Sequence, residues 1–112
     1  MKLQLLPALF LALTAASQAQ APVAQADAQA SAGAILFRDN CAKCHGANLE
    51  GTKKAPALAE IRTKKHWTDE KLTNRIQNGA GSKMPPFRDS LSSEQIQQLI
   101  AYLRAENRPT PQ

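Results

Sequence analysis

The sequence has few of the residues that usually build the core and the cross-links of a small domain. Its 112 residues include three Phe, one Tyr, one Trp and two cysteines. No run of alternating β-branched residues marks a strand, so no sheet is predicted. A disulfide between the two cysteines would close a very short loop and would stabilise the fold little. The folded domain is expected to have only about 80 residues, and a core of that size with few aromatic side chains is expected to enclose another group.

The N-terminal segment has the layout of a secretory signal peptide. Lys2 is followed by a mostly apolar run, Leu3 to Ala16, and then by small residues. The run is shorter than the roughly 20 residues of a membrane span. Cleavage is expected after Ala19, with Ala21 as the alternative site, and a buried N-terminal helix is the competing interpretation. Because no cysteine lies here, a lipid anchor is not expected.

The chain is predicted to divide into four parts. A signal peptide covers 1–19, a flexible tail rich in Ala and Gln covers 20–30, one folded domain covers 31–107, and a short tail covers 108–112. The net charge is +5. A basic exported protein is expected to meet an acidic partner or an anionic surface, whereas no motif for nucleic acid is present.

Periodicity predicts three helices and an all-α fold. The first covers 31–40, with Gly33 and Phe37 on a stripe that continues to the two cysteines. The second covers 68–78, where Thr68 can cap the first turn and Gly79 can end the helix. The third covers 93–105 and begins with a Ser-x-x-Gln capping box. The intervening segments, 46–66 and 79–91, are predicted to be loops that wrap a bound group.

The segment Cys41-Ala-Lys-Cys44-His45 allows four interpretations. A zinc site needs four ligands, and only His66 and scattered carboxylates remain to complete it. A thioredoxin-like redox pair needs a βαβ context that is missing, and a structural disulfide leaves His45 unexplained. The favoured interpretation is covalent haem attachment, for which Cys-x-x-Cys-His is the signature. Each thiol would form one thioether with the haem, and His45 would be the proximal iron ligand.

A haem iron has a second axial position, for which Met84 and His66 are the candidates. Met84 is followed by Pro85 and Pro86, which stiffen the strap, and preceded by glycines that let the backbone approach a bulky group. His66 lies in a basic stretch and is expected to be exposed. Met84 is therefore favoured, and a Met/His pair raises the iron potential.

Four motifs resemble those of the small class I c-type cytochromes, which are monohaem electron carriers of bacterial periplasms. The motifs are GAILFRDNCAKCHG, APAL, IQNGAGSKMPPF and LIAYLRA, within about residues 31–105. The resemblance implies that Pro56 offers its carbonyl to His45, that Leu58 packs on the haem and that Trp67 lies near a propionate. It also implies that Gly33 and Phe37 cross a leucine and a tyrosine of the last helix, Leu99 and Tyr102. Ala55 departs from the family, which usually has glycine before this proline.

These features together predict an exported cytochrome c with one haem c attached through Cys41 and Cys44. Its expected function is one-electron transfer between periplasmic redox partners, and it is not expected to be an enzyme by itself. The alternatives are a haem subunit of a periplasmic dehydrogenase complex, and a haem-based gas sensor or peroxidase-like protein.

Two groups of residues are expected to surround the haem. The first lines a central cleft: Cys41, Cys44, His45, Pro56, Leu58, Met84 and Phe87. The second could guide docking on an acidic partner: Lys43, Lys53, Lys54, Lys64, Lys65, Lys83 and Arg88.

Overall fold

The structure is a computed structural model that describes residues 2, 4, 12 and 22–110. The described residues form five helical elements: α1 (Pro22–Asn40), α2 (Ala42–His45), the 3₁₀ helix η1 (Ile61–Thr63), α3 (Asp69–Asn78) and α4 (Ser93–Arg104). Within the described residues there is no strand, only one isolated bridge between Ala80 and Met84. The all-α prediction is confirmed. The predicted signal peptide lies almost entirely outside the described residues.

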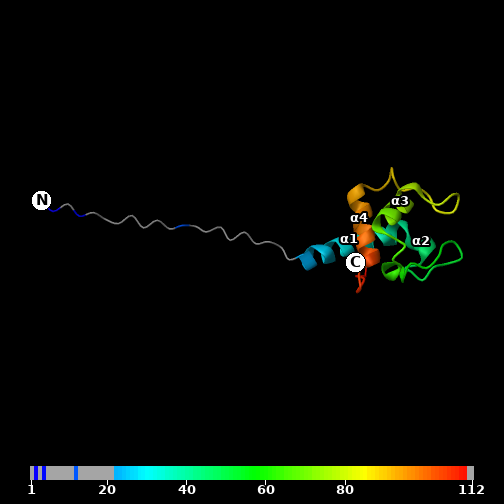
Figure 1. The fold of residues 1–112 in the computed structure, drawn as a ribbon, viewed down its shortest axis with the longest axis horizontal. Coiled ribbons are helices and arrows are strands. Elements are labelled where there is room, and N and C mark those ends of the chain that lie inside the picture. Colours follow the sequence, from blue (N-terminus) through cyan, green and yellow to red (C-terminus); the bar gives the residue numbers. More distant parts are fainter. Residues whose placement is uncertain (1, 3, 5–11, 13–21, 111–112) are drawn as a thin grey trace.

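The crossing of α1 and α4 is the centre of the fold (Figure 1). A Cβ atom on Gly33 would lie 2.0 Å from the backbone oxygen of Gln98, so the two helix backbones touch there. The rings of Phe37 and Tyr102 pack beside this point, with their centroids 5.4 Å apart and a tilt of 47°. Only glycine permits this approach, which explains why a glycine stands inside this helix despite its low helix propensity.

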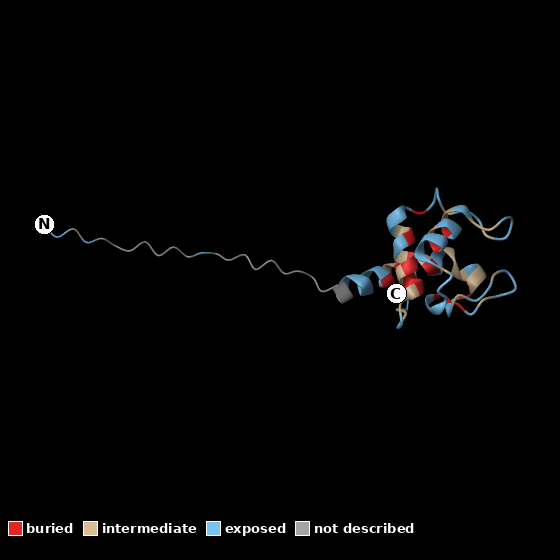
Figure 2. Cartoon of the chain, viewed as in Figure 1, coloured by how far each residue is buried: buried red, intermediate tan, exposed pale blue. Residues whose placement is uncertain are grey.

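Capping and burial agree with the predictions for α3 and α4. The Thr68 side chain accepts a hydrogen bond from the backbone N–H of Lys71, and Ser92 and Gln95 form both bonds of the capping box. Gly79 ends α3 with a positive φ of 72°, although its ψ of −166° lies outside the left-handed helical region. The apolar stripe of α4 is buried and consists of Ile96, Leu99, Ile100 and Leu103. Figure 2 shows the buried residues where the helices face one another, and exposed loops around them.

The start of α1 differs from the prediction. Residues 22–30 are helical, so the expectation of a flexible tail at 20–30 is wrong for this stretch. Alanine and glutamine are strong helix formers, and Pro22 stands at the first helical position, where its fixed φ favours the helix. Residues 24–29 are exposed, and burial begins at Ala30. The helix therefore extends beyond the stripe that packs on α4, because local propensity continues where packing does not. The remaining domain boundaries stay predictions.

The two long segments between the helices are not wholly irregular. The first contains η1, and the second is folded back by the Ala80–Met84 bridge. Both loops project from the same side of the α1–α4 pair, in green and yellow in Figure 1. No helix formed by the described residues is long and apolar enough to cross a membrane.

Candidate haem site

Cys41 lies between the end of α1 at Asn40 and the one-turn helix α2, which contains Cys44. The backbone N–H of Cys41 donates to the carbonyl of Phe37, and the carbonyl of Cys41 accepts from the N–H groups of Cys44 and His45. Cys41 is therefore bonded to the last turn of α1, although the helix itself ends at Asn40, as predicted. Both cysteines are free and half-buried. Burial, together with the neighbouring Cys44, raises the pKa of the Cys41 thiol to about 11, so this thiol is neutral near pH 7.

The ring of His45 is oriented by the loop that follows it. Its Nδ1 atom lies 2.8 Å from the carbonyl oxygen of Pro56. Because a carbonyl can only accept, Nδ1 is the donor in this hydrogen bond, and in the neutral imidazole Nε2 then keeps a free lone pair. The loop returns to this position through two further bonds: Thr52 Oγ1 donates to the Cys44 carbonyl at 2.6 Å, and the Gly51 N–H donates to the His45 carbonyl at 2.8 Å.

The departure from the family pattern at Ala55 does not disturb this loop. Ala55 does not have a positive φ, and its carbonyl accepts from the backbone N–H of Thr52 at 2.9 Å. The positive φ angles of this region belong instead to Gly46, Leu49 and Gly51. Leu49 has a φ of 61°, which is strained for a bulky residue, and its carbonyl accepts from both Leu58 and Ala59. The loop thereby brings Pro56 back to His45 without a glycine at position 55.

Met84 is presented by a strap bonded to the end of α3. Ala80 and Met84 exchange two backbone hydrogen bonds of 3.0 and 3.3 Å. A Cβ on Gly79 would lie 2.3 Å from the Met84 carbonyl oxygen, so this glycine is required by close approach as well as by its φ. The N–H of Phe87 then donates to the carbonyl of Ile76 at 3.0 Å. These bonds fix the strap on both sides of the methionine.

Two neighbouring cavities contain the predicted site residues. The first, of about 240 Å³, is mostly apolar and is lined by His45, Pro56, Leu58, Ile61, Trp67, Leu72, Ile76, Met84 and Leu103, among others. The second, of about 380 Å³, is lined by Cys41, Cys44, His45, Met84 and Phe87, among others. Both cavities share His45, Lys54, Ala55, Lys83 and Met84. The structure therefore gathers all seven residues of the predicted cleft around the histidine and the methionine.

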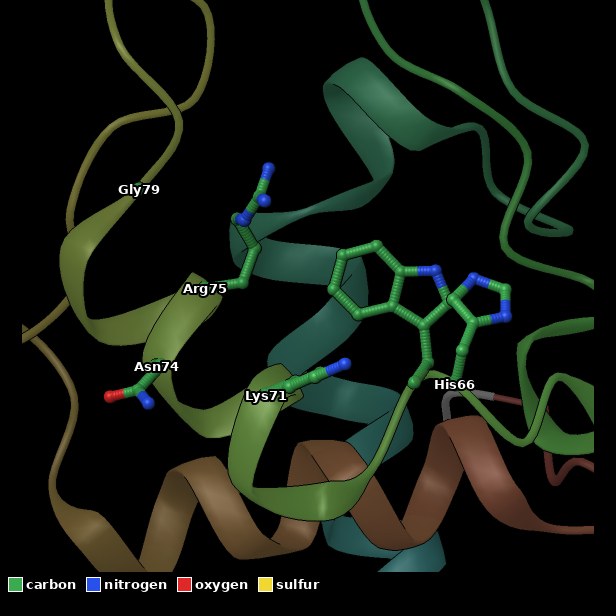
Figure 3. Close-up of a pocket in the computed structure, with 6 residues that line it drawn as sticks. His66, Lys71, Asn74, Arg75 and Gly79 are labelled. Carbon is green, nitrogen blue, oxygen red and sulfur yellow. The ribbon is translucent and has the colours of Figure 1, made fainter.

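His66 lies elsewhere. It belongs to a third opening of about 430 Å³, together with Trp67, Lys71, Asn74, Arg75 and Gly79 (Figure 3). The ring of His66 lies 5.9 Å from the ring of Trp67, and the residue is exposed, as predicted. His66 lines neither cavity that contains His45. Nor do the described residues contain any group of three or more His, Cys, Asp or Glu side chains that could hold a metal ion.

Sequence reasoning missed Arg75 as a residue of the site. Arg75 lines the apolar cavity, and its guanidinium carbon lies 5.4 Å from the centre of the Trp67 ring, a cation–π contact. Its spacing of three residues from Leu72 on α3 could have placed it next to that side chain on the helix surface. Of the basic residues expected near the haem, Lys43, Lys54 and Lys83 line one or both cavities.

Residues 28–103 match the protein family described as "Cytochrome C oxidase, cbb3-type, subunit III". One relative is the cbb3-type cytochrome c oxidase subunit FixP of Sinorhizobium medicae (strain WSM419), 37% identical over 65% of this chain and 28% of the relative. Another is cytochrome c6 of Leptolyngbya boryana, 37% identical over 68% of this chain and 91% of the relative. Among solved structures, cytochrome cL of Methylophaga aminisulfidivorans superposes with a TM-score of 0.60 at 32% identity, over 70% of this chain and 55% of that one.

The chain therefore belongs to the c-type cytochromes, in the family of the cbb3-type subunit III domain. It spans 26–28% of the length of the cbb3-type oxidase subunits that it matches. Its cofactor is one haem c, and Cys41 and Cys44 form the attachment signature.

The residues present fit this cofactor. Two free thiols lie at one edge of the adjoining cavities, and His45 has Nε2 available because Nδ1 is bonded to Pro56. The walls of the first cavity, of about 240 Å³, are largely apolar, as a porphyrin ring requires. The sequence-based prediction of the cofactor is confirmed, while the roles of the individual ligands are proposals.

Proposed function

We propose that this domain carries one electron at a time between redox proteins, with His45 and Met84 as the axial ligands of its haem iron. The observation that carries this proposal is that His45 and Met84 line the same two cavities, although they belong to different loops. Bound haem supplies a centre that alternates between ferric and ferrous iron. The chain supplies two axial ligands, an apolar wall that excludes water, and the thioether bonds that retain the cofactor.

The residues around the proposed ligands support this function. Pro56 orients the imidazole, and Leu58, Leu72 and Ile76 provide apolar surface for the ring. Thioether sulfur on the other side favours ferrous iron relative to an all-nitrogen site and raises the potential. If His45 and Met84 held the iron from both sides, no iron position would remain for a substrate, and we propose that the domain is not an enzyme by itself.

We also propose that the domain acts in the periplasm and meets acidic partners. The predicted export signal at 1–19 and the net charge of +5 of the full chain motivate this proposal. Lys54 and Lys83 lie on both cavities, so positive charge borders the route by which an electron would enter or leave. Electrostatic complementarity would orient the domain before transfer.

A redox titration of the exported holoprotein tests the proposal. A reversible transition of one electron per haem, with slow or absent carbon monoxide binding to the ferrous form, is expected for a saturated carrier. Rapid carbon monoxide binding would contradict it and favour a gas sensor or a peroxidase-like protein. Isolation of the native protein only in a fixed stoichiometric complex with a dehydrogenase would favour the alternative role as a haem subunit.

A further inference from the structure

Arg104, in the last turn of α4, makes three hydrogen bonds to the segment that leads from η1 into α3. Its Nη1 donates to the carbonyl of Ile61 at 3.0 Å, and its Nη2 donates to the carbonyl of Trp67. Its Nε donates to a carboxylate oxygen of Asp69 at 3.0 Å. The arginine side chain is 26% exposed, whereas that of Asp69 is 72% exposed. The two carbonyl contacts are therefore the more sheltered part of this cluster.

The two carbonyl partners of Arg104 both belong to residues of the haem cavity. Ile61 and Trp67 line the mostly apolar cavity that also contains His45 and Met84. One guanidinium group thus binds both ends of the Ile61–Trp67 segment, which forms part of the cavity wall, to α4. The fork of an arginine can serve three acceptors at once, whereas a lysine ammonium presents a single point of contact.

We propose that Arg104 is a positioning residue for the haem site, which holds the Ile61–Trp67 wall against α4 and thereby sets the place of the Trp67 ring. Trp67 lines the cavity, and its backbone carbonyl accepts a hydrogen bond from Arg104. A shift of this backbone would therefore move the ring. Movement of the indole changes the polarity and water access around the haem, which are determinants of its potential. The inference rests on haem in the proposed cavity.

Trp67 is the only tryptophan of the chain, so its fluorescence reports its own position. Haem quenches the emission of a nearby indole by energy transfer, with a steep dependence on distance. In the folded holoprotein without denaturant, Arg104→Gln is expected to raise the Trp67 emission above that of the wild type and to shift the midpoint potential. Arg104→Lys is expected to restore part of both properties. The visible haem spectrum of each variant shows separately whether the cofactor is retained.

Two variants serve as matched controls. Arg62→Gln removes an exposed arginine from the same segment, and Asp69→Asn weakens the ion pair while leaving both carbonyl acceptors. Both are expected to match the wild type in emission and potential. Wild-type emission and potential in Arg104→Gln would overturn the proposal even if its stability fell, and so would an equal effect of Asp69→Asn. If Arg104→Gln does not fold, Arg104→Lys decides: increased emission supports the proposal and wild-type emission overturns it.

Discussion

The Nδ1 atom of His45 lies 2.8 Å from the carbonyl oxygen of Pro56, eleven residues further along the chain. This bond determines the tautomer of the imidazole and leaves Nε2 for a metal. Since the acceptor is a backbone atom, its position depends on the path of the loop more than on the side chain at position 56. Thr52, which donates to the carbonyl of Cys44, and Leu49, which accepts from Leu58, hold that path.

Substitution of Met84 by alanine tests the distal ligand. Met84→Ala is expected to keep the haem covalently attached, to abolish the far-red methionine–iron charge-transfer band of the oxidised protein, and to lower the potential. Every tenfold loss of preference for ferrous iron lowers the potential by about 59 mV. Absorption spectroscopy and voltammetry measure both effects. His66→Ala is the matched control, because His66 lines a different opening, and it should keep the band. An unchanged band in Met84→Ala would assign the ligand role to another group.

Removal of both attachment cysteines tests whether the cofactor completes the core. Cys41→Ala combined with Cys44→Ala is expected to abolish covalent attachment and, with it, most of the folded protein. The physical reason is that the mostly apolar walls of the cavity lined by His45, Pro56 and Leu58 would be exposed to water without the haem. Circular dichroism and a haem stain on a denaturing gel are the measurements. Recovery of a stable, cooperatively unfolding protein without haem would show that the helices pack without it.

The close crossing of α1 and α4 predicts that replacing a helical glycine by alanine lowers the stability of this protein, contrary to helix propensity. Helix propensity alone would make Gly33→Ala stabilising by about 1 kcal/mol. The new Cβ would instead lie 2.0 Å from the backbone oxygen of Gln98, and the crossing would have to open. Overpacking of this kind costs roughly 1–3 kcal/mol in the free energy of unfolding. Ser31→Ala, at an exposed position of the same helix, should change stability by less than about 0.5 kcal/mol in urea unfolding. A more stable Gly33→Ala would disprove the close crossing.

Salt dependence tests the docking role of the cavity lysines. Lys83→Glu is expected to slow bimolecular electron transfer with the physiological partner, and the wild-type rate should fall as salt rises. A charge change worth roughly 1 kcal/mol at contact corresponds to about fivefold in rate. Stopped-flow reduction over a salt series is the measurement.

The control for docking must be chosen away from the haem wall. Arg104 is unsuitable because its side chain holds Ile61 and Trp67, so a substitution there would alter the site as well as the charge. Arg38→Glu carries the same change of charge at an exposed residue of α1 that lines neither cavity. Equal, salt-independent rates for the two variants would argue against charge-guided docking and in favour of a permanently bound subunit.

Most of the helices could be predicted from local sequence patterns. The bounds of α3 and α4 follow from caps and apolar spacing, both of which act within a few residues. The start of α1 was misplaced because the Ala- and Gln-rich segment was assigned by its composition as a tail, although its residues favour a helix. The 3₁₀ turn η1 escaped prediction because a single turn leaves no periodicity to detect.

The sequence by itself determined the cofactor, because two cysteines followed by a histidine at this fixed spacing are the signature of covalent haem attachment. The sequence also determined that Met84 lies in a stiff loop, because glycines precede it and two prolines follow it. Only the tertiary structure decided that Met84, and not His66, lines the cavities that contain His45, since both residues are candidates for the second axial position until the loops are folded. It also decided the role of Arg104, which reaches carbonyls 43 and 37 residues away along the chain. Contacts between such distant residues depend on how the helices pack, and no local pattern records them.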